Sequence, residues 1–329
     1  MPNIQAVIFD WAGTTVDFGS TSPVSAFMEA FRRAGIEVTD EETRAPMGLL
    51  KRDHIRTMLR MPRIEKAWEE RYKRIPNSDD VEALYADFEP ALMAVLPQHC
   101  DIKPYVLDAV AALRQKGIKI GSTTGFTASM MEVVAREASK AGYNPDMLVT
   151  ADDTGGVGRP WPYMVFENMK RLGLQDVRRI VKVGDTVSDM REGKNAGLIA
   201  VGVTEGSSII GLDKASWDKL PSLEQFALRK KAREMFFANG ADFAQVTKTG
   251  LVRIIPTEDI PQDKRKAIAS IKEGANGTEI KTYDKVRALE LLGKHLGVFD
   301  SNNGAAAEQE NNIFEVIDQS TREELDTSA

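Results

Sequence analysis

The sequence contains a single cysteine, Cys100, and only three histidines in 329 residues. One cysteine excludes an internal disulfide and a zinc site built from several thiolates, and it is compatible with a reducing compartment. The chain also lacks an apolar run long enough to cross a bilayer, and its N-terminus lacks a basic patch followed by an apolar segment. We therefore expect a cytoplasmic protein with no membrane partner, in which oxygen atoms bind any metal ion.

An excess of positive charge is absent as well. Lys and Arg total 43 against 49 for Asp and Glu, which gives a formal net charge of -6. This balance provides no general attraction for nucleic acid, so we expect no nucleic-acid partner and favour chemistry on a small molecule. Because single cores rarely exceed roughly 250 to 300 residues, the length predicts more than one domain.

Short apolar segments rich in β-branched residues predict a parallel sheet. Gly, Asp or Thr bounds each of them, as is typical of buried strands. Segments of helical periodicity separate the later ones, and this alternation is the βαβ rhythm of a doubly wound α/β fold. The predicted strands are 6–9, 118–121, 147–150, 180–183 and 198–203, and the predicted helices are 106–115, 129–141, 163–172 and 187–196.

The interval 20–97 departs from this rhythm. Charged and apolar residues alternate there at helical spacing, and no convincing strand is present. We interpret the interval as an α-helical cap domain inserted after the first strand, which leaves residues 1–19 and 98–246 as the doubly wound core. A cap of this kind implies that closure over the core completes the site and excludes water.

The character of the sequence changes after the core. A strand-like segment at 251–255, a turn at Asn276–Gly277 and a helix near 283–296 predict a separate appendage at 247–300. The remaining residues, 301–329, are polar and rich in Asn, Ala and Glu, which predicts a largely disordered tail.

Carboxylates follow two of the predicted strands. Asp10 comes directly after the first strand and precedes a turn of small residues whose amides can face an anion. Asp185 and Asp189 follow the fourth strand. Because the carboxyl ends of parallel strands meet at one edge of the sheet, we expect the three carboxylates to lie together. Oxygen ligands from two strands suit magnesium.

Groups suited to a phosphoryl oxygen are predicted at the same edge. The second strand ends in Ser, Thr and Gly at 121–125, and Arg159 lies between the third and fourth strands. A strand-end Asp taken singly is commonly a turn former or a helix N-cap. The convergence of four such elements favours a functional site.

The segments 10–17, 46–51, 118–125 and 181–190 resemble the phosphonatase family of the haloacid dehalogenase superfamily. The resemblance runs from the N-terminus to about residue 243. It implies hydrolysis of the carbon–phosphorus bond of phosphonoacetaldehyde to acetaldehyde and phosphate through an aspartyl phosphate. In that reaction Asp10 is the nucleophile, Lys51 is the amine that forms a Schiff base with the substrate, and His54 shuttles protons.

The same resemblance implies a ligand set and an assembly. Magnesium is expected on the Asp10 carboxylate, the Ala12 backbone carbonyl and Asp185, with Asp189 behind these ligands. The phosphoryl group is expected on Thr124, Gly125 and Arg159, and Met47 is expected to shape the pocket. The family also implies a homodimer. Ser20 and Phe126 stand where phosphonatases often have a cysteine and a tyrosine, and neither position is the nucleophile or the electron sink.

At position 12 this chain has Ala where ordinary phosphatases of the superfamily have Asp, and the chemistry of the reaction explains the difference. Phosphatases usually carry a second Asp two residues after the nucleophile, where it protonates an alkoxide leaving group. Cleavage of a carbon–phosphorus bond instead expels a carbanion, which requires an electron sink. An imine on Lys51 supplies one, provided that burial near a cation lowers the pKa of this lysine.

Two alternatives stay open. The first is a magnesium-dependent phosphomonoesterase or phosphomutase, which would require an acid at position 12 and would not need Lys51. The second arises because residues 251–300 resemble the C-terminal part of phage terminase small subunits. This second resemblance implies an assembly or DNA-packaging module, although the Lys and Arg residues there are scattered as on a solvated helix face.

Overall fold

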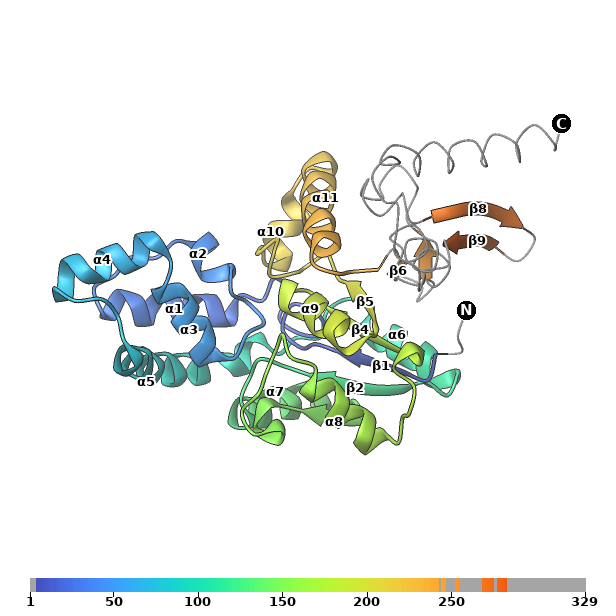
Figure 1. Ribbon diagram of the computed structural model, residues 1–329, viewed down its shortest axis with the longest axis horizontal. Coiled ribbons are helices and arrows are strands. Elements are labelled where there is room, and N and C mark those ends of the chain that lie inside the picture. Colours follow the sequence, from blue (N-terminus) through green and yellow to red (C-terminus); the bar gives the residue numbers. More distant parts are fainter. Residues whose placement is uncertain (1–3, 243, 247–251, 255–267, 275–276, 283–329) are drawn as a thin grey trace, which may run out of the picture. The chain divides into compact units, whose positions relative to one another are not determined.

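A parallel sheet of five strands organises residues 4–242 (Figure 1). The computed structural model describes these residues and, beyond them, the short segments 244–246, 252–254, 268–274 and 277–282. The strands lie in the order β3-β2-β1-β4-β5. They are β1 (Ala6–Phe9), β2 (Lys119–Thr123), β3 (Met147–Val149), β4 (Ile180–Gly184) and β5 (Ile199–Gly202), and they confirm the predicted doubly wound fold.

The strand order reverses between β1 and β4. Strands β2 and β3 extend the sheet on one side of β1, and β4 and β5 extend it on the other. Val7 of β1 lies opposite both Ile120 and Val181. In open parallel sheets, ligands bind outside the carboxyl ends of the strands where the order reverses. The residues that follow Phe9 and Gly184 therefore stand at the expected place for a site.

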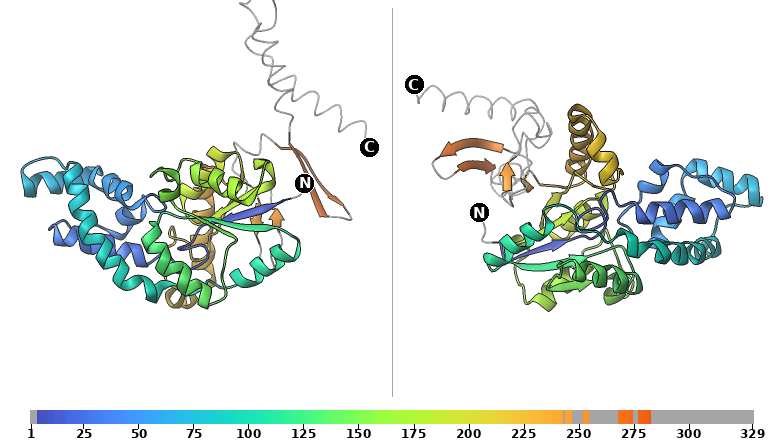
Figure 2. Two further views of the ribbon diagram at one scale, coloured as in Figure 1. Left: turned by 90° about the horizontal axis from the view of Figure 1, so that it is seen from below. Right: turned by 180° about the vertical axis from the view of Figure 1, so that it is seen from behind.

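Helices flank the sheet on both sides (Figure 2). Helix α8 packs on β2 and β3, and α9 packs on β4 and β5. At the start of α9, Thr186 and Asp189 form a capping box in which each side chain accepts a hydrogen bond from the other's backbone N–H. The flanking helices are α6 (Val106–Gln115), α7 (Ala128–Lys140), α8 (Tyr163–Leu172) and α9 (Val187–Ala196).

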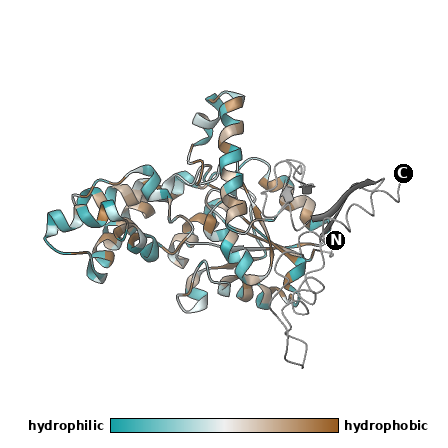
Figure 3. Cartoon of the chain, turned by 45° about the horizontal axis from the view of Figure 1, so that its top comes forward, coloured by the Kyte–Doolittle hydropathy of each residue, from teal (hydrophilic) through white to brown (hydrophobic). Residues whose placement is uncertain are grey.

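A helical insertion lies between β1 and β2, and its described residues contain no strand (Figure 1). Helix α5 packs along α1 and also against α3, and the rings of Phe27 and Phe88 stack with centroids 4.1 Å apart. Figure 3 shows hydrophilic residues along much of the outer helical surface and hydrophobic ones in the central strands. The helices are α1 (Ser22–Arg33), α2 (Asp40–Arg44), α3 (Lys51–Leu59), α4 (Pro62–Tyr72) and α5 (Ser78–Val95).

The two connections between the insertion and the sheet are tied to each other. Val16, on the outgoing connection, forms an antiparallel bridge with Ile102 on the returning one. The Asp17 carboxylate accepts hydrogen bonds from Thr21 and Ser22 at the start of α1. The same carboxylate lies 3.6 Å from Nδ1 of His99, which belongs to the returning connection. These contacts fix where the insertion leaves and rejoins the core.

Two helices after β5 were not among the predicted elements. They are α10 (Lys214–Lys219) and α11 (Ser222–Ala238). After them, β6 (Ala244–Val246) pairs antiparallel with β7 (Val252–Ile254), which lies within the strand-like segment predicted at 251–255. Residues 1–261 form one compact unit.

The second unit, residues 262–329, contains an antiparallel hairpin among its described residues. Its strands are β8 (Ile268–Gly274) and β9 (Gly277–Thr282), which flank the predicted turn. The predicted helix near 283–296 and the predicted disordered tail lie outside the described residues.

In the part of the chain that the structure describes, no helix is long and apolar enough to span a bilayer.

Candidate active site

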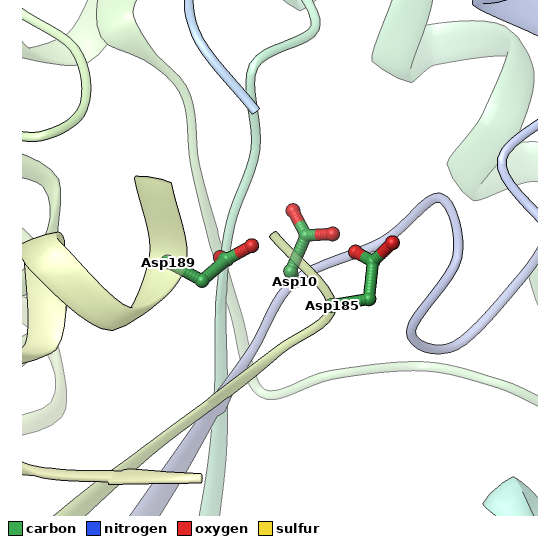
Figure 4. Close-up of side chains that lie close together, drawn as sticks. All are labelled: Asp10, Asp185 and Asp189. Atoms are coloured by element: carbon green, nitrogen blue, oxygen red, sulfur yellow. The ribbon is translucent and has the colours of Figure 1, made fainter. Parts of the chain in front are cut away.

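Three carboxylates lie together at the carboxyl edge of the sheet, as the strand ends predicted (Figure 4). Asp10 follows β1, Asp185 follows β4, and Asp189 lies in the first turn of α9. All three are buried, and each offers an oxygen within 4.8 Å of the others. Their side chains point toward the same region in Figure 4.

The loop after β1 fits closely around Asp185. Gly13 has a φ of +80°, and a Cβ atom on it would lie 2.1 Å from a carboxylate oxygen of Asp185, so only glycine is accommodated. The Thr14 hydroxyl lies 3.3 Å from the Asp10 carboxylate and 3.1 Å from that of Asp185, and the Ser208 N–H donates to Asp185. Burial raises the pKa of Asp185 well above its usual value, and the charges of Asp10 and Asp189 raise it further.

This donor set fits a hard divalent cation. Two of its three oxygen ligands come from strand ends and the third from the first turn of α9, and no thiolate or imidazole takes part in the cluster. Carboxylates held this close repel one another, and a cation between them removes that repulsion. The site is therefore a candidate metal site.

Arg159 joins the carboxylates from the opposite side. It is buried, and its guanidinium lies 2.8 Å from Asp10, 3.1 Å from Asp189 and 3.0 Å from Glu192. Burial opposes its positive charge, but these three carboxylates together raise the pKa of Arg159 above its ordinary value. A permanently charged group beside Asp10 suits the binding of a phosphoryl oxygen.

Lys51 begins α3 and is buried, with 6% of its surface exposed. Its Nζ lies 4.5 Å from the centre of the Phe126 ring, and among the described residues no carboxylate lies within ion-pairing distance of it. Burial lowers the pKa of Lys51 to about 8; the charge of Asp10 opposes the shift, and that of Arg159 adds to it. The amine is therefore poised to lose its proton near neutral pH.

His54 lies one helical turn after Lys51 and is fully buried. Its Nε2 lies 2.8 Å from the Thr43 carbonyl, which can only accept, so this nitrogen carries the proton. Burial lowers the pKa of His54 well below its usual value, and the charge of Lys51 lowers it further. The ring is neutral, and its Nδ1 is a buried acceptor without a partner in the described structure.

One pocket brings most of the predicted residues to one place. The insertion contributes Met47 and Lys51 to its walls, and the core contributes Asp10, Ala12, Gly125 and Arg159. Four other predicted residues are not among its lining residues: His54, Thr124, Asp185 and Asp189. The Thr124 hydroxyl accepts a hydrogen bond of 3.1 Å from the Phe126 N–H. The phosphate-binding role of Thr124 stays a prediction.

Two charged residues next to the carboxylate cluster were not predicted from the sequence. Lys182 and Glu192 are fully buried and contact each other, and both contact Thr123. The available signal was Lys182 itself, a lone charge within an otherwise apolar strand. Lys103 was missed too: its amine donates to the backbone carbonyls of Gly13, Glu205 and Gly206 and so holds the loop after β1.

Comparisons with known proteins agree with this geometry. A family model described as haloacid dehalogenase-like hydrolase matches residues 4–197. The phosphonoacetaldehyde hydrolase of Bacillus cereus strain AH187 is 46% identical over 252 residues, which cover 77% of this chain and 95% of the relative. That of Bacillus anthracis is 46% identical over 255 residues, with the same shares covered.

A solved structure is similar to this chain as well. The phosphonoacetaldehyde hydrolase-like protein from Oleispira antarctica has a TM-score of 0.71 and 39% sequence identity, with 75% of this chain and 88% of that chain covered. None of these matches bears on the resemblance of residues 251–300 to terminase small subunits, which stays a prediction. The chain belongs to the haloacid dehalogenase-like hydrolases and, within them, to the family of the phosphonoacetaldehyde hydrolases.

Proposed function

We propose that the protein hydrolyses the carbon–phosphorus bond of phosphonoacetaldehyde and releases acetaldehyde and phosphate. The observation that carries this proposal is the position of Lys51, a buried amine with a pKa of about 8 that lines the same pocket as Asp10. The names of the relatives support the same substrate.

The first step is imine formation. The neutral amine of Lys51 attacks the aldehyde carbon, and water leaves to give a protonated imine. We assign the proton transfers of this step to Nδ1 of His54, which lies one helical turn after Lys51 on α3 and has no hydrogen-bond partner in the described structure. The lowered pKa of Lys51 supplies the neutral amine without a strong external base.

The second step is transfer of the phosphoryl group. A carboxylate oxygen of Asp10 attacks phosphorus while the carbon–phosphorus bond breaks, and the electron pair moves into the imine to give an enamine. Arg159, 2.8 Å from Asp10, lies where it can hold the phosphoryl oxygens in line. Ala12 presents no acid, and none is needed because the imine accepts the electron pair of the breaking bond, so the departing carbon needs no proton at that step.

Hydrolysis completes the cycle. Water cleaves the aspartyl phosphate and restores Asp10, the enamine takes a proton on carbon, and a second water releases acetaldehyde from Lys51. One water is lost and two are consumed, so one water is used for each substrate. The steps balance without an oxidant or a reductant.

We further propose that the metal ion is magnesium and that Asp10, Asp185 and the Ala12 carbonyl hold it, with Asp189 behind them. When bound, magnesium supplies positive charge that offsets the negative charge of the phosphoryl oxygens. The oxygen-only donor set supports this choice.

A homodimer and a cytoplasmic location remain proposals. The first rests on the family and is tested by sedimentation, and the second rests on the composition and is tested by cell fractionation.

The phosphomonoesterase alternative is less well supported. Ala12 lines the pocket at the position where a phosphatase would need its acid, and the buried Lys51 would have no function in ester hydrolysis. The DNA-packaging alternative depends on residues that lie mostly outside the described structure, and no observation here favours it.

The direct test is release of acetaldehyde and phosphate from phosphonoacetaldehyde in the presence of magnesium. We expect Lys51→Arg to lose turnover by more than roughly 1,000-fold, because a guanidinium forms no imine. Lys66→Arg is the matched control, since the Lys66 side chain is 77% exposed on α4 and far from any assigned role. Equal activity of Lys51→Arg and wild type would overturn the proposal.

A further inference from the structure

Thr123 is a hydroxyl whose hydrogen-bonding capacity is fully used. It donates to Glu192 Oε2 at 3.0 Å and accepts from Arg159 Nη2 at 2.8 Å and from Lys182 Nζ at 2.9 Å. A hydroxyl has one donor and two acceptor positions, so this arrangement is saturated. The position of Arg159 is therefore linked to two charged groups that do not line the pocket.

Lys182 meets the same partners as Arg159. Its Nζ lies 2.8 Å from Asp189, 3.3 Å from Glu192 and 2.9 Å from Thr123. Arg159 contacts those three groups as well, and in addition it contacts Asp10. The contact that distinguishes the two cations is thus the one with the proposed nucleophile.

Charge balance explains why a second cation is present. Three carboxyl groups, those of Asp10, Asp189 and Glu192, contact Arg159, and Lys182 contacts two of them, Asp189 and Glu192. Without Lys182, the guanidinium of Arg159 would be the cation shared among Asp189, Glu192 and Asp10 in this cluster. With Lys182 in place, the first two carboxylates have another partner, and Arg159 can face Asp10.

Glu192 fixes the orientation of the guanidinium. It holds the Nε edge of Arg159 at 3.0 Å, while the Nη2 group on another edge faces Asp10 at 2.8 Å. When one edge of a planar guanidinium is hydrogen-bonded, the directions of its other donors are fixed as well. Without the contact to Glu192, Arg159 can rotate away from Asp10.

Stability alone does not account for these charges. Lys182 and Glu192 are both 0% exposed, and Glu192 Oε1 has no hydrogen-bond partner in the described structure. Buried ion pairs are often no more stable than apolar residues of similar volume, and an unsatisfied oxygen adds a cost. A function for the pair accounts for its presence.

We infer that Lys182 and Glu192, acting through Thr123, are positioning residues that hold Arg159 against Asp10 for phosphoryl transfer. The inference rests on the proposed function for its kinetic readout. Neither residue lines the pocket to which Lys51 contributes. They therefore serve the step at phosphorus and leave imine formation on Lys51 unchanged.

The test compares two single variants with the double variant. Glu192→Gln and Lys182→Met each keep the length of the side chain and remove its charge. We expect each to lower kcat for phosphate release by roughly 100-fold, the size of effect seen when an electrostatic contact to a reacting group is lost. The amount of imine trapped on Lys51 by borohydride does not fall below that of wild type, because imine formation is unchanged while the step that consumes the imine is slower.

The double variant K182M/E192Q removes one basic and one acidic side chain, so the balance of charge around Arg159 stays as in wild type. We expect it to be at least about tenfold more active than either single variant and to melt no lower than wild type, because one buried charge of each sign is removed. The matched control is K66M/E70Q, which removes an exposed pair 3.9 Å apart on α4 and leaves activity unchanged.

Several results would overturn the inference. Single variants that keep more than half of wild-type kcat would do so, as would losses that simply multiply in the double variant. Trapped imine that falls together with turnover would indicate general damage to the pocket instead of positioning. If wild-type protein releases no acetaldehyde, the proposed function fails, and a crystal structure of Glu192→Gln then tests the inference separately. The inference predicts that Arg159 is displaced from Asp10 in that structure. An unchanged contact of 2.8 Å between the two residues would contradict the inference.

Discussion

The hydroxyl of Ser188, in the first turn of α9, donates a hydrogen bond of 3.1 Å to the backbone carbonyl of Met47 in the helical insertion. The neighbouring Gly48 lies directly against Thr186, and Gly125 lies against the carbonyl of Leu49. The insertion thus touches the core through the segment that immediately precedes Lys51. These contacts position the amine opposite Asp10.

Gly48 should tolerate no side chain. Its φ is +87°, and a Cβ atom there would lie 2.4 Å from the Thr186 hydroxyl, so Gly48→Ala must push the insertion away from the core. We expect kcat/KM to fall by roughly 100-fold or more, as when reacting groups are misplaced by about 1 Å. Gly173→Ala is the control, because its φ of +67° imposes similar strain while nothing lies within 4 Å. A Gly48→Ala enzyme as active as this control would contradict the account.

The pH dependence of imine formation should report the pKa of Lys51. The amine must be neutral to attack, and its pKa is lowered from 10.5 to about 8. We expect the rate of borohydride trapping with substrate to rise with pH through about 8 and then to level off. A rate that continues to rise toward pH 10 would show an ordinary, solvated lysine.

Removing the charge of Lys51 should stabilise the fold. The folded protein binds its proton more weakly than the unfolded chain, so Lys51 destabilises the native state below pH 8, and this cost disappears as the pH rises from 8 to 10.5. The shift corresponds to a free energy on the order of 3 kcal/mol. Lys51→Met should therefore raise Tm at pH 7 by several degrees, with little difference from wild type above pH 10.5. Equal melting temperatures at pH 7 would argue against a buried amine.

Metal removal should affect stability as well as activity. Asp10, Asp185 and Asp189 bring carboxyl oxygens within 4.8 Å of one another, and an ion that binds only the folded protein stabilises it. A chelated sample should therefore lose turnover and melt lower than the magnesium-loaded protein. Asp185→Asn should melt no lower than wild type without metal and gain no stability from added magnesium. A magnesium-dependent rise in Tm that survives Asp185→Asn would place the ion elsewhere.

The sheet and its carboxylates could be predicted from the sequence because both depend on local signals. Apolar runs fix the strands, and the first polar residues after them, Asp10 and Asp185, must meet at one edge of a parallel sheet. Lys51 is different: its spacing from His54 on a helix equally suits a solvated surface, and only the family resemblance predicted its role.

The charge layer of Lys182 and Glu192 could not be predicted from spacing. Glu192 lies three residues after Asp189 on α9, which is ordinary for a helix, and its partners Thr123 and Arg159 come from distant parts of the chain. Such a network exists only once β2, β4 and α9 have packed together. Tertiary packing also places Thr124 away from the pocket lining, although it precedes Gly125 in the same loop.

The most direct test of the central claim is borohydride reduction of the enzyme during turnover of phosphonoacetaldehyde, followed by peptide mass mapping. The account predicts a two-carbon adduct on Lys51, loss of activity in proportion to labelling, and no adduct in Lys51→Arg. Full turnover with no adduct on Lys51, or with the label on another lysine, would contradict it.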